Sequence, residues 1–153
     1  MVEFSIYMLL YSIRYMYYEY PKRRVFLAGP MRGMYRRDSL AWRERATELL
    51  GETFAVRHAM RQRGEEETMP NSQSAVIRDL KDISDSDILL VNDTVKNVSM
   101  IGTSMEIMYA HLKEKIVIAF GDAHTGDYFM DRHVPLRFPT LEDAVQFLIT
   151  FYE

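Results

Sequence analysis

The chain has 153 residues, of which 48% are hydrophobic and 27% are charged, and it contains no cysteine. This composition suits one folded domain and excludes a disordered chain, a disulfide framework, a thiolate metal site and a cysteine nucleophile. The formal net charge is −3, which gives no electrostatic reason to expect a nucleic-acid polymer as partner. A chain without cysteine is compatible with the reducing cytoplasm, where we expect the protein.

The first 21 residues are interpreted as an extension ahead of a domain at 22–153. Residues 4–18, FSIYMLLYSIRYMYY, are mostly apolar and aromatic. They are fewer than the roughly 20 residues of a membrane helix, and Arg14 interrupts them, so we expect no membrane association. The segment also lacks the basic start and the cleavage site of a signal peptide. It is either an extra helix or strand packed on the domain or on another subunit, or a translated leader.

The rest of the chain alternates short apolar runs with helical patterns. In chain order, the predicted elements are a strand at 23–29, a helix at 36–50, a strand at 53–59, a helix at 75–86, a strand at 87–93, a helix at 103–114, a strand at 115–121 and a helix at 140–153. A mobile loop is predicted at 61–74. This alternation predicts an α/β fold with a parallel sheet and helices on both faces.

Cap residues define the ends of two predicted helices. For the helix at 36–50, Asp38 or Ser39 is the expected N-cap and Gly51 the expected C-cap. For the last helix, Thr140 is the expected cap, with acidic residues following in the first turn. Ligands of parallel sheets bind beyond the carboxyl ends of the strands, so the loops after the strands are the places to look for function.

The loop after the first strand, Gly29-Pro30-Met31-Arg32-Gly33, combines glycines with an arginine. Glycine lets backbone N–H groups approach a ligand closely, and arginine supplies a planar charged fork. The loop therefore suits an anion or phosphate, although a tight turn with a solvated arginine explains the same residues.

Two acidic or mixed clusters each have two interpretations. Asp79, Asp82, Asp85 and Asp87 either form a solvated helix face, or they include an Asp79 that points into the ligand crevice. The segment at 124–133 contains two histidines and two aspartates. Its spacing matches no metal-ligand pattern, so we expect a solvated loop and no metal site.

Glu106 also has two interpretations. Thr103-Ser104-Met105-Glu106 fits a capping box, in which Glu106 at the third helical position bonds back to the cap. Alternatively, a carboxylate in the first helical turn is held ionised by the helix dipole and faces the crevice. Such a group suits a developing oxocarbenium carbon, as nucleophile or as electrostatic partner.

The order of motifs resembles the nucleoside 2-deoxyribosyltransferase family, which includes related nucleoside 5′-monophosphate N-glycosidases. The motifs are VFLAGPMRG, RDLKDISDSDILLV and GTSMEIMYAHLKEKIVIAF, and they cover residues 23–121. The resemblance implies a flavodoxin-like fold, a homodimer or larger homo-oligomer, a nucleoside or nucleotide as small-molecule substrate, and no cofactor.

The same resemblance implies roles for individual residues. Glu106 would be the nucleophile that captures the anomeric carbon, and Asp79 would bind the nucleobase or donate a proton to it. The remaining implied residues line the substrate: Phe26, Ala28, Gly29, Pro30, Met31, Arg32, Gly33, Met100, Gly102 and Thr103.

The sequence departs from the family pattern at two of these positions. Phe26 stands where many members have a tyrosine that steadies the catalytic carboxylate. Met100 stands where many transferases have an aspartate that reads the base, and a thioether neither donates nor accepts a proton. The Gly-x-x-Arg-Gly loop is similar to the phosphate loop of the hydrolase relatives. A transferase, a nucleotide hydrolase and an inactive nucleotide sensor therefore all stay open.

Overall fold

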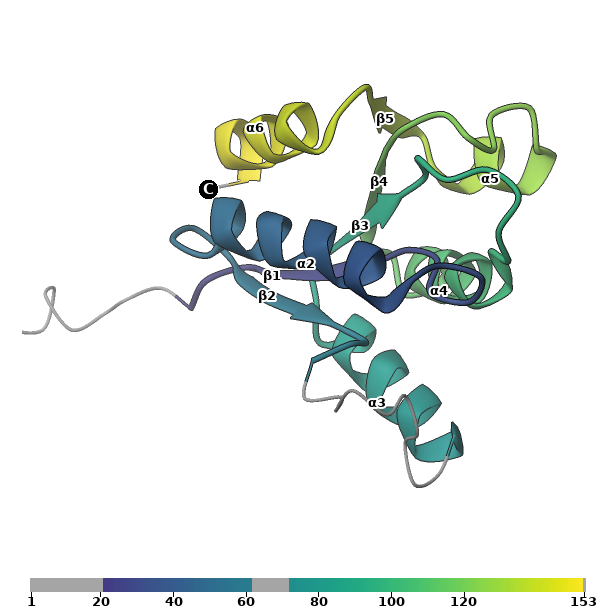
Figure 1. The fold of residues 1–153 in the computed structure, drawn as a ribbon. Coiled ribbons are helices and arrows are strands. Elements are labelled where there is room, and N and C mark those ends of the chain that lie inside the picture. Colours follow the sequence, from purple (N-terminus) through teal and green to yellow (C-terminus); the bar gives the residue numbers. More distant parts are fainter. Residues whose placement is uncertain (1–20, 62–71, 153) are drawn as a thin grey trace, which may run out of the picture.

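The computed structural model describes residues 21–61 and 72–152. The strands are β1 (Arg24–Ala28), β2 (Ala55–His58), β3 (Ile88–Asn92), β4 (Ile116–Phe120) and β5 (Leu136–Phe138). The helices are α2 (Arg36–Leu50), α3 (Ser72–Ser84), α4 (Ile101–Leu112), α5 (Tyr128–His133) and α6 (Leu141–Tyr152). The predicted alternation of strands and helices is confirmed (Figure 1).

All the strands belong to one parallel sheet in the order β2-β1-β3-β4-β5. This is the strand order of flavodoxin-like folds, so the expected fold class is confirmed. The order reverses between β1 and β3, and ligand sites of such sheets lie in the crevice at this reversal, beyond the carboxyl ends of the strands. The fold therefore points to the loops that follow β1 and β3.

Successive strand residues alternate between two hydrophobic cores, one on each face of the sheet. Val25 and Leu27 pack with residues of α2 and α6. Phe26 and Ala28 pack with residues of α3, α4 and α5. Figure 1 shows α2 and α6 on the opposite side of the sheet from α3 and α4. Because both faces are covered, the central strands are unbroken apolar runs apart from Arg24 at the start of β1 and Asn92 at the end of β3.

The ends of the helices confirm some of the predicted caps and contradict one. Gly51 is the C-cap of α2, and the Thr140 hydroxyl accepts the Asp143 N–H at 3.1 Å at the start of α6. The predicted N-cap at Asp38 or Ser39 is wrong, because α2 already begins at Arg36. Ser39 is buried inside the helix, where its hydroxyl has a different role.

The segment after β4 is more ordered than its sequence indicates. It contains α5, which was expected to be loop, and β5, for which no element was predicted. These elements have six and three residues, which is too short for a hydrophobic period to show in the sequence.

Some expectations fall on residues that the structure does not describe. They concern the N-terminal extension up to residue 20 and the central part of the predicted loop, 62–71. In the two described ranges, no helix combines the length and the apolar character that crossing a membrane requires.

Candidate active site

The loops after β1 and β3 lie against each other at the carboxyl edge of the sheet. Gly29 is packed so closely that an added Cβ would lie 3.0 Å from Asn92 Cβ and 2.9 Å from the Trp42 ring. At the other end of the first loop, a Cβ on Gly33 would lie 3.9 Å from Val98. The predicted substrate loop therefore forms one wall of the crevice at the strand-order reversal.

The residues of this loop differ in exposure. Gly29 and Pro30 are buried, whereas Arg32 and Gly33 are exposed. Gly33 has a φ of +87°, a conformation that favours glycine, and the Met34 N–H closes the turn on the Met31 carbonyl at 3.2 Å. The loop thus has a fixed base and an exposed tip that carries the arginine.

Four of the predicted substrate-lining residues meet in one hydrophobic cluster. Phe26 and Ala28 are fully packed in the core beneath α3 and α4, with 0% and 1% of their surface exposed. Met31 and Met100 are half-buried and pack against the same cluster. Phe26 and Ala28 therefore lie in the core with no surface open to a ligand, and the two methionines are partly open.

Helix α4 starts earlier than predicted, which changes the interpretation of Glu106. The N-cap is Met100, which makes no side-chain cap hydrogen bond, and there is no acidic residue in the first turn. Glu106 lies in the second turn and is half-buried. The capping-box interpretation is therefore wrong. The alternative is also wrong in placing this carboxylate in the first helical turn, where the helix dipole would hold it ionised. Thr103 is buried, while Gly102 is exposed.

The position of Glu106 around α4 follows from the helix period. Thr103, Ile107 and Ala110 form the buried face of α4. Residues two apart are about 200° apart around a helix, so Ser104 and Glu106 flank this buried face on opposite sides. Ser104 lines a pocket toward α5. Since α4 packs against both α3 and α5, Glu106 lies on the flank that faces α3.

Helix α3 carries Asp79, which is 9% exposed and belongs to the buried face with Ala75 and Ile83. The Arg78 Nε lies 3.6 Å from the Asp79 Oδ1. Arg78 is itself held by the Ala59 carbonyl at 2.7 Å. The interpretation of this cluster as a solvated acidic face is therefore wrong for Asp79, and the alternative, in which Asp79 points into the ligand crevice, stays a prediction.

Further charged groups surround the end of β2. Asp82 is paired with Arg61, and both side chains are largely buried. Burial, together with the charges of Arg43, Arg61 and Arg78, lowers the pKa of His58 to about 4. His58 is consequently neutral near pH 7 in the midst of arginines, because a further positive charge there would be both desolvated and repelled.

The loop after β4 is organised by Asp93, which follows β3 directly and is 0% exposed. Its carboxylate lies 2.5 Å from the His124 Nδ1 and 2.5 Å from the Arg137 Nη1. It also accepts the backbone N–H of His124 at 3.3 Å. The expectation of a solvated loop at 124–133 is therefore wrong for His124, although Asp131 is exposed.

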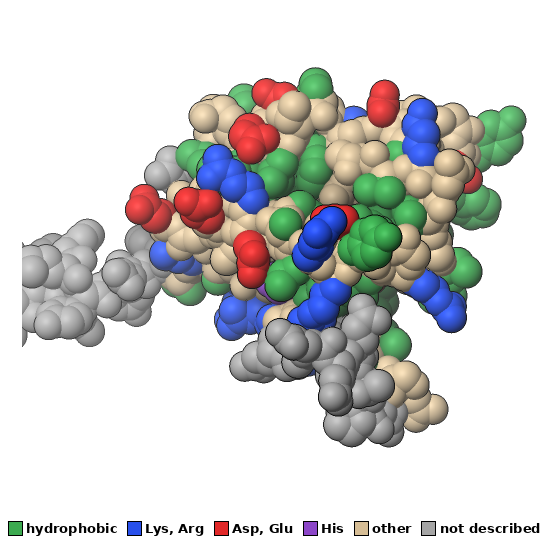
Figure 2. Space-filling model, in the orientation of Figure 1, with side chains coloured by type: hydrophobic (Ala, Val, Ile, Leu, Met, Phe, Trp, Pro, Cys, Tyr) green, Lys and Arg blue, Asp and Glu red, His purple; other side chains and the backbone are tan. Residues whose placement is uncertain are grey.

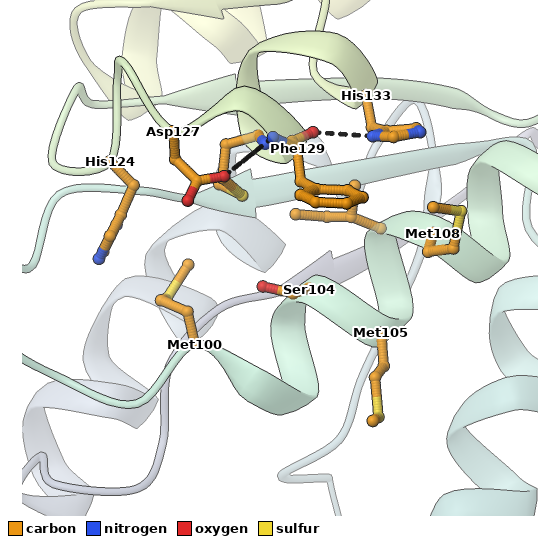
Figure 3. A pocket seen from close by; sticks show the side chains of 10 residues that line it. Met100, Ser104, Met105, Met108, His124, Asp127, Phe129 and His133 are labelled. Carbon is orange, nitrogen blue, oxygen red and sulfur yellow. Dashed lines mark hydrogen bonds between the residues drawn. The ribbon is translucent and has the colours of Figure 1, made fainter.

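A pocket of about 270 Å³ lies between α4 and α5. It is lined by Met100, Ser104, Met105, Ile107, Met108, His124, Asp127, Phe129, Met130 and His133. Figure 3 shows Ser104 and Met108 of α4 on one side of this pocket and Phe129 of α5 on the other, whereas Met105 points away. Glu106 does not line it, so this pocket is separate from the flank of α4 that faces Asp79.

The described residues contain no group of three or more histidine, cysteine, aspartate or glutamate side chains that could hold a metal ion. Figure 2 shows acidic and basic side chains interspersed over one face of the molecule rather than a continuous basic surface. Near the ends of β1 and β3, the structure thus places a glycine loop, Asp79 and Glu106 on the neighbouring helices α3 and α4, and several arginines.

Sequence reasoning missed the buried charges that hold these loops, above all Arg43 and Asp93. Arg43 shares the buried face of α2 with Ser39, Ala46 and Leu50, and this spacing of three or four residues was visible in the sequence. Asp93 comes directly after a buried strand, the position at which ligand and loop contacts of parallel sheets concentrate.

Comparison of the sequence with protein-family models and with curated proteins gives no match. Comparison with solved structures gives several. A 2-deoxyribosyltransferase from Bacillus psychrosaccharolyticus superposes with a TM-score of 0.62 at 17% identity, covering 80% of this chain and 90% of that one. The 2-deoxyribosyltransferase of Leishmania mexicana gives 0.64 at 14% identity, covering 86% and 99%.

A CMP N-glycosidase from Clostridium botulinum is also similar, with a TM-score of 0.57 at 19% identity, covering 84% of this chain and 99% of that chain. At these identities the similarity establishes the fold. The chain thus has the fold shared by 2-deoxyribosyltransferases and a nucleotide N-glycosidase, over almost the full length of those proteins.

Proposed function

We propose that the protein cleaves the N-glycosidic bond of a (2′-deoxy)nucleoside through a covalent ester on Glu106, as a nucleoside 2-deoxyribosyltransferase. The observation that carries this proposal is the position of Glu106: half-buried, in the second turn of α4, on the flank that faces the buried Asp79 of α3. A glutamate that neither caps its helix nor lies in open solvent suits a reacting carboxylate.

In the proposed first step, the bond between the anomeric carbon and the base nitrogen breaks. The bonding electrons leave with the base, whose ring nitrogen is protonated or hydrogen-bonded, with Asp79 as the proposed donor. The Glu106 carboxylate meets the positive charge that develops on the anomeric carbon and forms the glycosyl ester. Met100 and Phe26 supply no polar group for the base, so the proposed reaction relies on Asp79.

In the second step, a ring nitrogen of another base attacks the anomeric carbon, and the ester bond to Glu106 breaks. Attack by water instead makes the enzyme a hydrolase. Exclusion of water from the crevice decides between these outcomes. The proposed chemistry is carried out by side chains and substrate, and it requires neither a metal nor an organic cofactor.

The second candidate is a (deoxy)nucleoside 5′-monophosphate N-glycosidase. The exposed Arg32, at the tip of the Gly29–Gly33 loop, favours it because a guanidinium there could pair with a 5′-phosphate. The fold similarity to a CMP N-glycosidase agrees with it. A nucleotide sensor without catalysis is the third candidate, and it is favoured by the apolar Phe26 and Met100.

One incubation distinguishes these candidates. The protein is mixed with a deoxynucleoside and a foreign free base, or with the corresponding 5′-monophosphate, and the products are separated by chromatography. A swapped nucleoside is the expected result. Free base and free sugar indicate a hydrolase, and cleavage of the monophosphate alone indicates the nucleotide enzyme. Thermal stabilisation by ligand without any product would contradict catalysis.

We also propose that the protein acts as a homodimer or larger homo-oligomer. Ile101, Met105 and Leu112 are 68%, 67% and 69% exposed, and they recur at helical spacing along one side of α4. Such a stripe suits an interface between copies of the chain. Sedimentation should show an oligomer that Met105→Lys converts to monomer, and a wild-type monomer would contradict the proposal.

A further inference from the structure

The side chain of Arg43 lies beneath the loop that follows β1, and it is the largest fully buried side chain among the described residues, with 1% of its surface exposed. Its Nη2 donates to the Gly29 carbonyl at 2.9 Å. Its Nη1 donates to the Ser39 carbonyl at 2.6 Å and to the Ser39 hydroxyl at 2.8 Å. A charged group this deep in a protein is costly unless its hydrogen bonds are made, so these bonds are strongly favoured.

Ser39 extends the same arrangement by one residue along the loop. Its hydroxyl donates to the Pro30 carbonyl at 3.1 Å. Arg43 and Ser39 therefore hold the carbonyl oxygens of Gly29 and Pro30, both on the side of α2. Proline has no N–H, so the peptide between these residues leaves no donor unsatisfied.

The direction of these carbonyls sets the direction of the next amide. The described residues contain no cis peptide bond, and in a trans peptide the C=O and the following N–H point in opposite directions. Because the Pro30 carbonyl points toward α2, the N–H of Met31 points away from α2. That is the side of α3 and α4, where the Met31 side chain also packs.

Two other contacts prevent the loop from shifting as a unit. Trp42 packs against Gly29 so closely that an added Cβ would lie 2.9 Å from the ring, and the Arg43 guanidinium lies 4.6 Å from the centre of the same ring. The Ser39 hydroxyl also lies 3.3 Å from the sulfur of Met60, just beyond β2. The base of the loop is thus fixed to α2 and to the segment after β2.

We infer that Arg43 is a positioning residue that fixes the Gly29–Gly33 loop with its Met31 amide directed into the crevice before substrate binds. This inference rests on the proposed function, in which that loop holds the sugar or phosphate end of the substrate. Arg43 itself has no exposed surface from which to contact a ligand, so it acts through the loop.

Arg43→Lys tests the inference, because an ammonium cannot reproduce the planar fork that bonds Gly29 and Ser39 together. We expect KM for the cleaved nucleoside or nucleotide to rise about tenfold, with kcat changing much less, since the loss of a charge-assisted hydrogen bond displaces the binding loop and leaves Glu106 in place. Amide hydrogen exchange at residues 31–33 should accelerate. The matched control is Arg45→Lys, an exposed position on the same helix.

A purely structural role would lower the Tm of Arg43→Lys without separating KM from kcat and without a local change in exchange. That result, or unchanged KM and exchange in a folded variant, would overturn the inference. If Arg43→Lys fails to fold, Ser39→Ala provides the test, with the same changes in smaller amount. Should the wild-type protein cleave no glycosidic bond, the proposed function fails, whereas the exchange rates of residues 31–33 still decide the role of Arg43.

Discussion

Two loops at the carboxyl edge of the sheet are held by buried charges of opposite sign. The loop after β1 lies over the guanidinium of Arg43, which donates to the Gly29 carbonyl oxygen. The loop after β4 is held by the carboxylate of Asp93, which binds an amide and an imidazole of His124. The sign of the buried charge decides which backbone groups are drawn inward, and therefore which groups the loop presents to the crevice.

Glu106 lies on the helix between these two loops, and its substitution should have the largest effect. Glu106→Gln removes the nucleophile while preserving shape, so turnover should fall roughly a thousandfold or more. Steady-state assays of base release check this, with circular dichroism to confirm the fold. The exposed Glu44 supplies the control Glu44→Gln, which should keep full activity. Turnover by Glu106→Gln at the wild-type rate would exclude the nucleophile role.

Asp93→Asn should cause the largest loss of stability. It leaves the largely buried Arg137 without its carboxylate, and breaking a buried ion pair in this way costs about 3–5 kcal/mol. Urea denaturation measures the change in the free energy of unfolding. Asp85, whose partner Lys81 lies on the surface, supplies the control Asp85→Asn, for which we expect little change. Equal losses in the two variants would show that Asp93 does not organise the loop.

Gly121 and Gly126 provide a matched pair within the loop after β4. Their φ angles are +93° and +90°, but a Cβ on Gly121 would lie 2.5 Å from the Asp93 carbonyl oxygen, whereas a Cβ on Gly126 meets nothing within 4 Å. Gly126→Ala should therefore cost about 1 kcal/mol from backbone strain alone, and Gly121→Ala about 3 kcal/mol. Thermal unfolding of both variants isolates the contribution of the close contact. Similar Tm values would mean that the contact relaxes without cost.

His58 gives the smallest predicted effect, and it belongs to the charges around the first loop. Its pKa falls from 6.5 to about 4 in the folded protein, through burial and then through Arg43, Arg61 and Arg78. The unfolded chain therefore binds more protons between these values, and the stability contributed above pH 6.5 is lost as the pH falls toward 4. Solvent screening reduces this contribution to on the order of 1–2 kcal/mol. Urea denaturation at pH 7 and pH 4.5 measures the free energy of unfolding. Between these pH values His58→Gln should lose less of it than the wild type does, and equal losses would contradict the lowered pKa of His58.

The sheet and its main helices were predictable because their residues carry long, unbroken patterns. The run DILLVND at 87–93 could only be a buried strand, and it proved to be the central strand β3. Glu106 and Asp79 could be singled out as candidates because their motif order resembles a known family. Their surroundings could not be predicted, since the helix start at Ile101 depends on tertiary packing rather than on the capping residues.

The partners of the buried charges were beyond single-sequence reasoning for a different reason. Arg43 lies at the helical spacing of the buried Ala46 and Leu50, but the spacing does not indicate that the Gly29 carbonyl accepts its guanidinium. Asp93 and Arg137 are 44 residues apart, so their pairing depends on β3, β4 and β5 lying side by side. Long-range pairs of this kind leave no periodic signal in the chain.

The fixed base and exposed tip of the Gly29–Gly33 loop have a consequence for engineering. The bonds to α2 end at Pro30 and Arg32 is exposed, so replacing Arg32 alters what the loop offers to a ligand while the scaffold beneath it stays intact. A small library at this one position is therefore a practical starting point for redirecting substrate preference.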